Sequence, residues 1–403
     1  MSVVDQPGAL AGGGRRLARR LGTEAPNAIA RRRAELAAAG IELTDLTDTN
    51  PTRHGLFDPA ILEVVARHTL RAGRYDPGPR GPWPARAALA ERYGGDPEDY
   101  WLCASTSEAY GWLFSLLAEP GEAVAVPRPG YPLVEPLARL HSVATRGYPT
   151  FYVHPSGWEL DRDSLADVVA DKAVRAVVVV NPNNPTGAYA DAGVVDVAAA
   201  RGLPLIADEV FFPYRLGVGD EAGGVAGGRI AGHESTLTFG LDGLSKLLAA
   251  PQLKVGWIRL SGPRLARAQA GRALDEIADT YLSVNAPVAL ALPELLGLAD
   301  GCVARVTARL AANLAIAQAV LNPWRVRTVY GGWMMLLDVP PLMEADALSV
   351  ALMERAGLYV HPGYFYDLDG TTLAISLLAE EGVFRESCTR LAAALTVLAA
   401  DRD

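Results

Sequence analysis

Lysine is scarce in this sequence. Of the 37 basic residues in the 403-residue chain, only Lys172, Lys246 and Lys254 are lysines, and all the others are arginines. The guanidinium of arginine stays protonated in proteins, whereas a desolvated lysine amine loses its proton readily and becomes a nucleophile. If the chemistry of this protein needs an amine, the sequence offers three candidates.

Other absences narrow the class of protein. Cys103, Cys302 and Cys388 are too few and too far apart for a disulfide framework or a zinc site, which favours a reducing, cytoplasmic setting and no metal. The net charge of -9 argues against a nucleic-acid partner and favours a small-molecule ligand. No apolar run is long enough to span a membrane, and the basic N-terminus lacks the apolar stretch of a secretory signal.

The pattern of apolar runs predicts two domains. From about Glu98 to Leu260, short β-branched runs alternate with helical patterns, which is typical of a mostly parallel sheet with crossover helices. After Pro287, long amphipathic helices precede short strands and a final helix. We therefore expect an α/β protein with a flexible N-terminal arm (residues 1–25), a large domain (60–290) and a smaller α+β domain (26–59 plus 291–403).

Polar residues follow the expected strands directly, at the carboxyl ends where open α/β sheets bind their ligands. Two prolines and a glycine make the turn Asn181–Gly187 rigid, so an asparagine amide in it is held in one orientation. Asp208 ends an apolar run, and a carboxylate at a buried strand end needs a partner such as a protonated pyridine nitrogen. Lys246 follows another apolar run, where desolvation suits an amine that forms an imine.

Each of these patterns also has an ordinary structural explanation. Asparagine, proline and glycine form turns in proteins of every kind. Asp208 on its own also fits a helix N-cap, and Lys246 on its own fits a solvated surface lysine. Only their combination along the chain points to one kind of chemistry.

Together, three motifs resemble the fold-type I pyridoxal phosphate enzymes of the class I/II aminotransferase family. They are N-P-x-N-P-T-G from Asn181, D-E-V from Asp208 and S-K-x-x-x-x-P from Ser245, in the family's order and at its approximate spacing. The likeness extends from about Leu43 to Ala379. It implies the aspartate aminotransferase fold, pyridoxal 5'-phosphate as cofactor, an amino acid substrate, and a homodimer with shared active sites.

Carried over position by position, the resemblance implies a role for each motif residue. Lys246 would form the Schiff base with the cofactor, Asp208 would hold the pyridine nitrogen, and Asn184 would bind the phenolic oxygen. Tyr131 would stack on the cofactor ring. The cofactor phosphate would be bound by Ser105, Thr106, Ser107, Ser245 and Lys254, and by Tyr75 of the neighbouring subunit.

Four positions depart from the family's pattern. Lys254 stands where an arginine usually binds the phosphate, and Gly243 stands where a serine is common. Phe211 replaces a tyrosine that donates to the phenolic oxygen, so we expect a more basic oxygen and a higher pKa of the imine. Ala374 stands where an arginine usually binds the α-carboxylate of the substrate, which is the most serious departure because that arginine is a strong, directional anchor.

Arg53 and Arg80 are the candidates to replace the missing arginine, and Phe211 is expected to line the substrate site. Arg53 lies in a loop that matches the segment through which substrates enter in the family, although a loop arginine also fits a solvated surface role. His54 and His361 lie in loops near the inferred site and are candidates for proton relay, but loop histidines are commonly solvated or structural.

Three functions fit this pattern. We expect transamination, in which an amino donor displaces Lys246 and the freed amine moves the α-proton to the cofactor carbon. The alternative is a lyase or carbon–carbon bond-forming transferase of specialised biosynthesis, which diverts the same quinonoid intermediate to elimination and addition, for example on S-adenosylmethionine. Phe211 and Ala374 favour that alternative. A ligand-sensing regulator is the third, and we expect the acidic charge and the roughly forty preceding residues to disfavour an attached DNA-binding domain.

Overall fold

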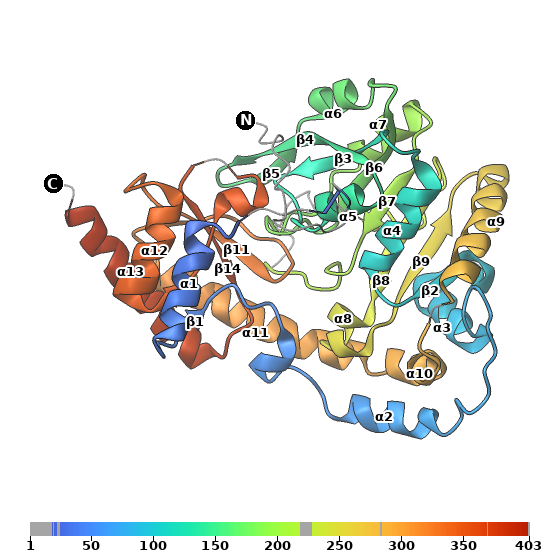
Figure 1. Ribbon diagram of the computed structural model, residues 1–403, viewed down its shortest axis with the longest axis horizontal. Helices are drawn as coiled ribbons and strands as arrows, with labels where there is room; N and C mark the ends of the chain where they lie inside the picture. Colours follow the sequence, from blue (N-terminus) through green and yellow to red (C-terminus); the bar gives the residue numbers. More distant parts are fainter. Residues whose placement is uncertain are drawn as a thin grey trace, which may run out of the picture.

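The computed structural model describes residues 18, 20–21, 25–217, 228–282, 284–368 and 370–401. The predicted N-terminal arm, residues 1–25, lies almost entirely outside the described residues. The described chain forms a larger lobe around an eight-stranded sheet and a smaller lobe around a four-stranded sheet (Figure 1). The predicted α/β class is confirmed.

The central sheet has the strand order β2-β9-β8-β7-β6-β3-β4-β5. The strands from β8 to β4 run parallel to one another, whereas β2 and β9, β8 and β9, and β4 and β5 pair antiparallel. The sheet is therefore mostly parallel, as the apolar runs predict. Its strands are β2 (Tyr100–Cys103), β3 (Ala123–Arg128), β4 (Ala144–Val153), β5 (Gly157–Leu160), β6 (Val174–Val180), β7 (Leu205–Asp208), β8 (Thr238–Gly243) and β9 (Gly256–Ser261).

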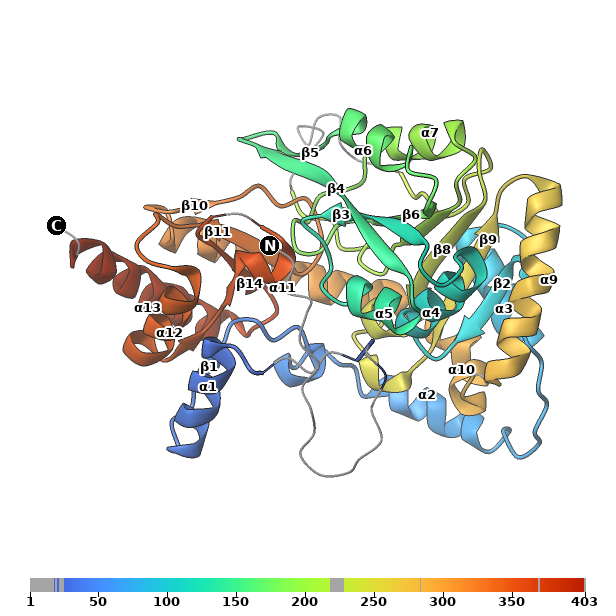
Figure 2. The same ribbon diagram turned by 45° about the horizontal axis from the view of Figure 1, so that its top comes forward.

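Helices cover both faces of this sheet, so its strands are apolar on both sides. In β6, Val177 and Val179 pack with α6 and α7, whereas Ala176 and Val178 pack with α4, α5 and α9. Figure 2 shows α6 and α7 on one side of the sheet and α4 and α5 on the other. The helices of this lobe are α2 (Ala60–Thr69), α3 (Trp83–Tyr93), α4 (Thr106–Leu117), α5 (Val134–Leu140), α6 (Arg162–Val168), α7 (Gly193–Ala200), α8 (Leu244–Leu247), α9 (Arg264–Tyr281) and α10 (Ala286–Leu296), with the short 3-10 helices η2 (Pro97–Asp99) and η3 (Pro251–Leu253).

The smaller lobe combines the N-terminal segment with the C-terminal third of the chain. Its antiparallel sheet has the order β10-β11-β14-β13, and β1 pairs in parallel with β12. Its elements are α1 (Ala28–Ala38), β1 (Thr44–Asp45), η1 (Pro51–His54), α11 (Ala299–Val320), β10 (Arg325–Val326), β11 (Met334–Asp338), α12 (Ala345–Ala356), β12 (Leu358–Tyr359), β13 (His361–Pro362), η4 (Gly363–Tyr366), β14 (Thr372–Ser376) and α13 (Glu381–Ala400).

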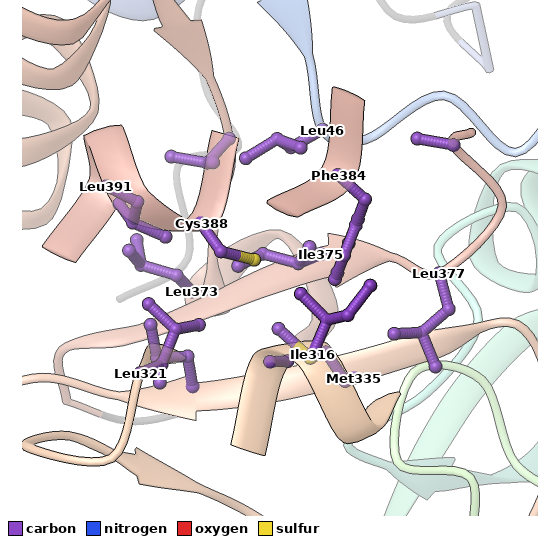
Figure 3. Packing of buried hydrophobic residues seen from close by; sticks show 14 of the residues in the cluster. Leu46, Ile316, Leu321, Met335, Leu373, Ile375, Leu377, Phe384, Cys388 and Leu391 are labelled. Atoms are coloured by element: carbon purple, nitrogen blue, oxygen red, sulfur yellow. The ribbon is translucent and has the colours of Figure 1, made fainter. Parts of the chain in front are cut away.

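The core of the smaller lobe lies between its sheet and the helices α11 and α13. Ile316 of α11 and Phe384 of α13 meet Met335 and Ile375 of the sheet (Figure 3). Leu46, which follows β1, packs into the same core and ties the N-terminal segment to this lobe. The predicted domain boundary at residue 290 falls within α10, which packs against α2 and α3.

No single described helix is both long and apolar enough to cross a membrane. The consecutive helices α10 and α11 reach that length and hydropathy only together, and they are bent by 77° where they meet.

Candidate active site

The carboxyl ends of β6, β7 and β8 lie side by side at one edge of the central sheet. In the parallel register, Val180 is level with Asp208, and Asp208 is level with Leu241. The chain leaves β6 into the turn 181–187 and leaves β8 into α8, which carries Lys246. Three motifs that are far apart in the sequence therefore meet at one place, as strand ends in open α/β sheets do.

Lys246 is half-buried in α8, and its amine contacts two aromatic rings. Nζ lies 4.5 Å from the centroid of the Trp333 ring and 5.2 Å from the centroid of the Phe211 ring. Burial lowers the pKa of Lys246 to about 8, and the charge of Asp208 opposes this effect only in part. The lowered pKa increases the neutral, nucleophilic fraction of the amine near neutral pH.

Asp208 is a buried carboxylate that accepts hydrogen bonds from two other elements. Oδ1 accepts from the backbone N–H of Val210 at 3.3 Å, and Oδ2 accepts from the hydroxyl of Tyr110 at 3.1 Å. Burial raises the pKa of Asp208 to about 6, although both hydrogen bonds and the charge of Lys246 favour the anion. A buried anion of this kind is stabilised by a cationic ligand group.

The turn after β6 has three asparagines, and two of them are used within the protein. Asn181 donates to Glu209 Oε1 at 3.0 Å and accepts from the N–H of Ala190, while Asn183 donates to the carbonyl of Pro129 and accepts from Thr186. Asn184 differs, because its buried Oδ1 has no hydrogen-bond partner among the residues that the structure describes. Its amide is therefore the one in this turn that is available to a ligand.

The N-terminus of α4 faces the ends of β8 and β9. Ser105 caps the helix by accepting from the N–H of Glu108 at 3.1 Å, and Thr106 and Ser107 form its first turn. A Cβ at Gly256 would lie 3.2 Å from the backbone nitrogen of Thr106, which is tighter than an ordinary contact, so glycine lets these two segments approach without a shift. The free N–H groups and the dipole of a helix N-terminus suit an anion.

Two further residues of the predicted phosphate site come after β8 in the chain, Ser245 in α8 and Lys254 directly after η3. Ser245 is half-buried next to Lys246, and Lys254 is exposed with a left-handed backbone at φ 54°. Lys254 makes no ion pair within the described parts of the chain, so its charge is available to an anion.

Tyr131 and Tyr75 differ in their surroundings. Burial, followed by the nearby charge of Asp208, raises the pKa of Tyr131 to about 12, which places this ring close to the candidate site. The neighbouring N–H of Gly130 donates to the carbonyl of Tyr366 at 3.2 Å, so the loop with Tyr131 also contacts the smaller lobe. Tyr75 is 75% exposed and lies in a groove with the end of α9 and the start of α10, away from these residues.

Arg53 lies in η1, which is attached to the smaller lobe. Its guanidinium pairs with Asp48 at 3.2 Å and is 70% exposed, so most of its donors face solvent. The hydroxyl of Ser376, at the end of β14, donates to the carbonyl of Asp48 at 2.8 Å and fixes this loop. His54 also lies against Asp48, 3.2 Å from its carbonyl. Arg53 therefore stays a candidate for substrate binding, next to the end of β14.

The contacts of Arg80 argue against the predicted role in substrate binding. Nε and Nη2 each donate to Asp275 at 2.6 Å, and Nη1 donates to Glu98 at 2.6 Å. The guanidinium also stacks over the Trp101 ring at 4.4 Å. Because all its donor nitrogens are already engaged, Arg80 ties the loop before α3 to α9 and has no free edge for a carboxylate.

Residues 76–395 match the family model described as aminotransferase class I and II. The chain belongs to this family. Class I and II aminotransferases depend on pyridoxal phosphate in general, and the residues at the three strand ends are those that the resemblance names. Within the described ranges, no group of three or more histidine, cysteine, aspartate or glutamate side chains is arranged to hold a metal ion.

The curated relatives of this chain are named for different reactions. The chain is 29% identical over 280 residues to the alanine aminotransferase of Mycobacterium tuberculosis (strain ATCC 25618 / H37Rv), covering 66% of this chain and 62% of that protein. It is 32% identical over 235 residues to the S-alkyl-thiohydroximate lyase SUR1 of Arabidopsis thaliana, covering 53% of this chain and 48% of that protein. The chain thus spans only about half to three-fifths of the length of these two relatives.

A solved structure shows the same fold. The alanine aminotransferase from Pyrococcus furiosus superposes with a TM-score of 0.81 at 20% identity, over 92% of this chain and 96% of that chain. The predicted aspartate aminotransferase fold is therefore confirmed.

Phe211 has no hydroxyl, and Tyr214 is the tyrosine nearest to it in the sequence that could replace the missing donor. Phe211 packs edge-on against Trp333, with ring centroids 5.3 Å apart. The hydroxyl of Tyr214, three residues later, donates to the backbone carbonyl of Lys246 and is fully buried. Tyr214 is thus committed to the backbone of α8 and does not replace the donor that Phe211 lacks.

Ala374 faces an apolar wall. It is fully buried in β14 between Leu336 and His361 of the neighbouring strands, and its face of the sheet packs with Trp158, Met334 and Tyr366. His361 is hydrogen-bonded to the hydroxyl of Tyr366 at 3.0 Å, and burial lowers its pKa. Arg327 contacts this cluster, with its guanidinium 5.1 Å from the centroid of the Trp158 ring, but its Nε donates to Asp338 at 2.8 Å and its Nη2 donates to Thr372 at 3.3 Å.

Two residues of the site escape prediction from the sequence. Trp333 reaches Lys246 from the start of β11 in the smaller lobe, and Tyr110 reaches Asp208 from inside α4. The only sequence signal for Trp333 is the preceding Gly331-Gly332 pair, which marks a close backbone approach. Tyr110 lies within an apolar helical pattern and has no signal of its own.

Proposed function

We propose that this protein is a pyridoxal 5'-phosphate-dependent aminotransferase that acts on an amino acid and uses Lys246 to hold its cofactor. The observation that carries the proposal is the meeting of the Lys246 amine, the Asp208 carboxylate and the unpaired Asn184 amide at one sheet edge. Burial lowers the pKa of the Lys246 amine to about 8, which suits a nucleophile near neutral pH.

The residues present fit this cofactor. Asp208 offers a buried anion to the ring nitrogen, Asn184 offers an amide to the phenolic oxygen, and Tyr131 offers a ring beside Asp208. The first turn of α4, with Ser105, supplies N–H groups and hydroxyls for the phosphate. When bound, the cofactor supplies an electron sink that acidifies the α-carbon of an amino acid.

The chain's own residues supply binding and proton transfer. An anionic Asp208 keeps the ring nitrogen protonated, which maintains the electron sink. The amine of Lys246, kept neutral by burial, would move the α-proton of the substrate. Phe211 and Trp333 exclude water from that amine and keep its pKa low.

We also propose a cytoplasmic homodimer with shared active sites, working in biosynthesis. The Tyr75 side chain is 75% exposed on its own chain, which supports a role for this residue at a neighbouring subunit. Cys103, Cys302 and Cys388 are free and buried, which supports a reducing compartment.

A lyase stays the second candidate. The apolar wall at Ala374 and the similarity to a relative named as a lyase both favour it. The two functions differ in their products. Transamination would release a keto acid that keeps the side chain of the donor and would pass the amino group on without free ammonia, whereas elimination would release the side-chain leaving group, ammonia and a keto acid that lacks that group. Mass spectrometry of the products from a panel of amino acids therefore separates them.

The central claim is tested by borohydride reduction of the protein with its cofactor, followed by peptide mapping. We expect the label on the peptide that contains Lys246 and none in Lys246→Arg. Lys172→Arg, an exposed lysine replaced in the same way, is the matched control and keeps the label. A label that persists in Lys246→Arg would contradict the proposal.

A further inference from the structure

Tyr110 links α4, whose N-terminus is the predicted phosphate site, to Asp208, the predicted partner of the cofactor ring nitrogen. It lies one turn into α4, and its hydroxyl donates to Asp208 Oδ2 at 3.1 Å. Tyr110 is 1% exposed and Asp208 is 4% exposed, so water does not compete for this hydrogen bond. The Phe114 ring, 5.7 Å away, packs against the tyrosine ring and limits its movement.

The surroundings of Asp208 make this single donor important. Lys246 supplies a positive charge, whereas Glu209 and Asp242 are acidic groups whose charges work against the anion, and Tyr131 lies nearby as a neutral phenol. The hydrogen bonds come from the N–H of Val210 and from Tyr110. Because a hydrogen bond to the charged form of a buried acid stabilises that form, loss of the hydroxyl shifts Asp208 toward its neutral form.

We propose that Tyr110 is a positioning residue whose hydroxyl holds the Asp208 carboxylate in place, and in its anionic form, for the ring nitrogen of the cofactor. The inference rests on the proposed function and adds a residue to it. The Asp208 carboxylate and the ring nitrogen would share one proton. A hydrogen bond from Tyr110 makes the carboxylate less basic, so it would keep that proton on the ring nitrogen.

Another buried tyrosine shows what an ordinary structural hydroxyl does here. Tyr148 is 3% exposed in β4 and donates at 2.8 Å to the backbone carbonyl of Val178. That bond satisfies a neutral carbonyl, and the hydroxyl makes no hydrogen bond to a carboxylate. Tyr148→Phe therefore removes the same atom, from a strand of the sheet that carries Asp208 and without a hydrogen bond to Asp208, which makes it the matched control.

The test compares Tyr110→Phe, Tyr148→Phe and the unsubstituted protein in the dissociation constant for pyridoxal 5'-phosphate, measured by absorbance across pH 5 to 9. We expect Tyr110→Phe to weaken binding at least about tenfold near neutral pH, the usual effect of a hydrogen bond to a charged group. The pH below which binding weakens should also rise, because burial already brings the pKa of Asp208 to about 6 and the hydroxyl opposes that rise. Tyr148→Phe should leave both quantities unchanged.

A double-mutant cycle separates positioning from packing. In an Asp208→Asn background there is no charge to hold, so Tyr110→Phe should then leave cofactor affinity unchanged. If Tyr110→Phe does not fold, 3-fluorotyrosine at position 110 keeps the ring, strengthens the donor and should move the pH midpoint downward.

Unchanged affinity and midpoint in both Tyr110 variants, or an effect that persists in the Asp208→Asn background, overturns the inference. Failure of the unsubstituted protein to bind the cofactor at Lys246 overturns the proposed function itself, so the two failures are distinguishable.

Discussion

Arg229 is the cation of a buried charge cluster beneath the candidate site. Its Nη1 lies 2.9 Å from Glu209 Oε2 and 3.9 Å from Asp242 Oδ2, and the side chain of Glu209 is fully buried. The other oxygen of Glu209 accepts from Asn181 at 3.0 Å and from the N–H of Ile230 at 2.6 Å. Arg229 therefore supports, through Glu209, the turn that presents the Asn184 amide.

Replacement of Arg229 by methionine keeps most of the side-chain volume and leaves two buried carboxylates without their cation. Removing one partner of a buried ion pair costs about 3–5 kcal/mol, because the remaining charge is uncompensated. Arg355 provides the control. It pairs with Asp401 at 2.7 Å, with 50% and 56% of the two side chains exposed, and an exposed pair contributes about 0–1 kcal/mol.

The loss in the free energy of unfolding caused by Arg229→Met should grow as the pH rises. Burial raises the pKa of Asp242 to about 7, and the charge of Arg229 lowers it, so the substitution raises this pKa further. A carboxyl whose folded pKa lies above its unfolded value binds an extra proton in the native state, so stability falls as pH rises between the two values. Arg229→Met should therefore lose more stability at pH 8 than at pH 5.5.

Urea unfolding followed by circular dichroism, at equal cofactor content, measures both effects for Arg229→Met and Arg355→Met. A loss no larger than that of Arg355→Met, or a loss that shrinks as pH rises, would refute this reasoning.

Two further predictions concern the substrate side of the site. Arg53→Gln should raise the KM for amino donors at least about tenfold, since a hydrogen bond to a charged group contributes about 1.5–3 kcal/mol, without changing cofactor affinity. Steady-state kinetics check this, and Arg80→Gln, which should lower stability but not raise KM, is the control; a KM that rises only in Arg80→Gln would contradict the assignment. Trp333→Ala should cost about 3–5 kcal/mol of stability and, by admitting water, should raise the pKa of Lys246 from about 8 toward its ordinary value. The pH dependence of cofactor attachment to Lys246 measures the pKa, and an unchanged midpoint would mean that the indole does not desolvate the amine.

The residues at the strand ends of the site could be predicted from the sequence because nearby residues in the chain determine where each strand ends. Proline and glycine fix the turn after β6, and the apolar runs before Asp208 and Lys246 mark buried strands whose register brings them together. The contacts of Tyr110 and Trp333 could not be predicted in this way. They depend on the direction in which a side chain leaves α4 or β11, and only the packing of these elements against the sheet sets that direction.

The same limit explains the assignment of Arg80. In the sequence, an arginine between Pro79 and Gly81 in a loop of the expected site is as available as Arg53. The acids that engage Arg80 include Asp275, which lies 195 residues away on α9. A sequence shows which residues carry a charge. It does not show which distant residue pairs with each charge, because that depends on how the helices pack in the folded chain.

The wall at Ala374 determines where a substrate carboxylate can lie. A carboxylate left without a partner against buried apolar groups is strongly unfavourable, and the face of Ala374 is formed by Trp158, Met334 and Tyr366. We therefore expect a substrate carboxylate to point away from this wall and an apolar side chain to be stabilised against it. Arg327 lies against this wall but is already engaged by Asp338, whereas Arg53 lies in a loop held through Asp48 and Ser376 at the end of β14 and is mostly exposed. An aminotransferase with this arrangement should prefer amino donors with apolar side chains over acidic ones.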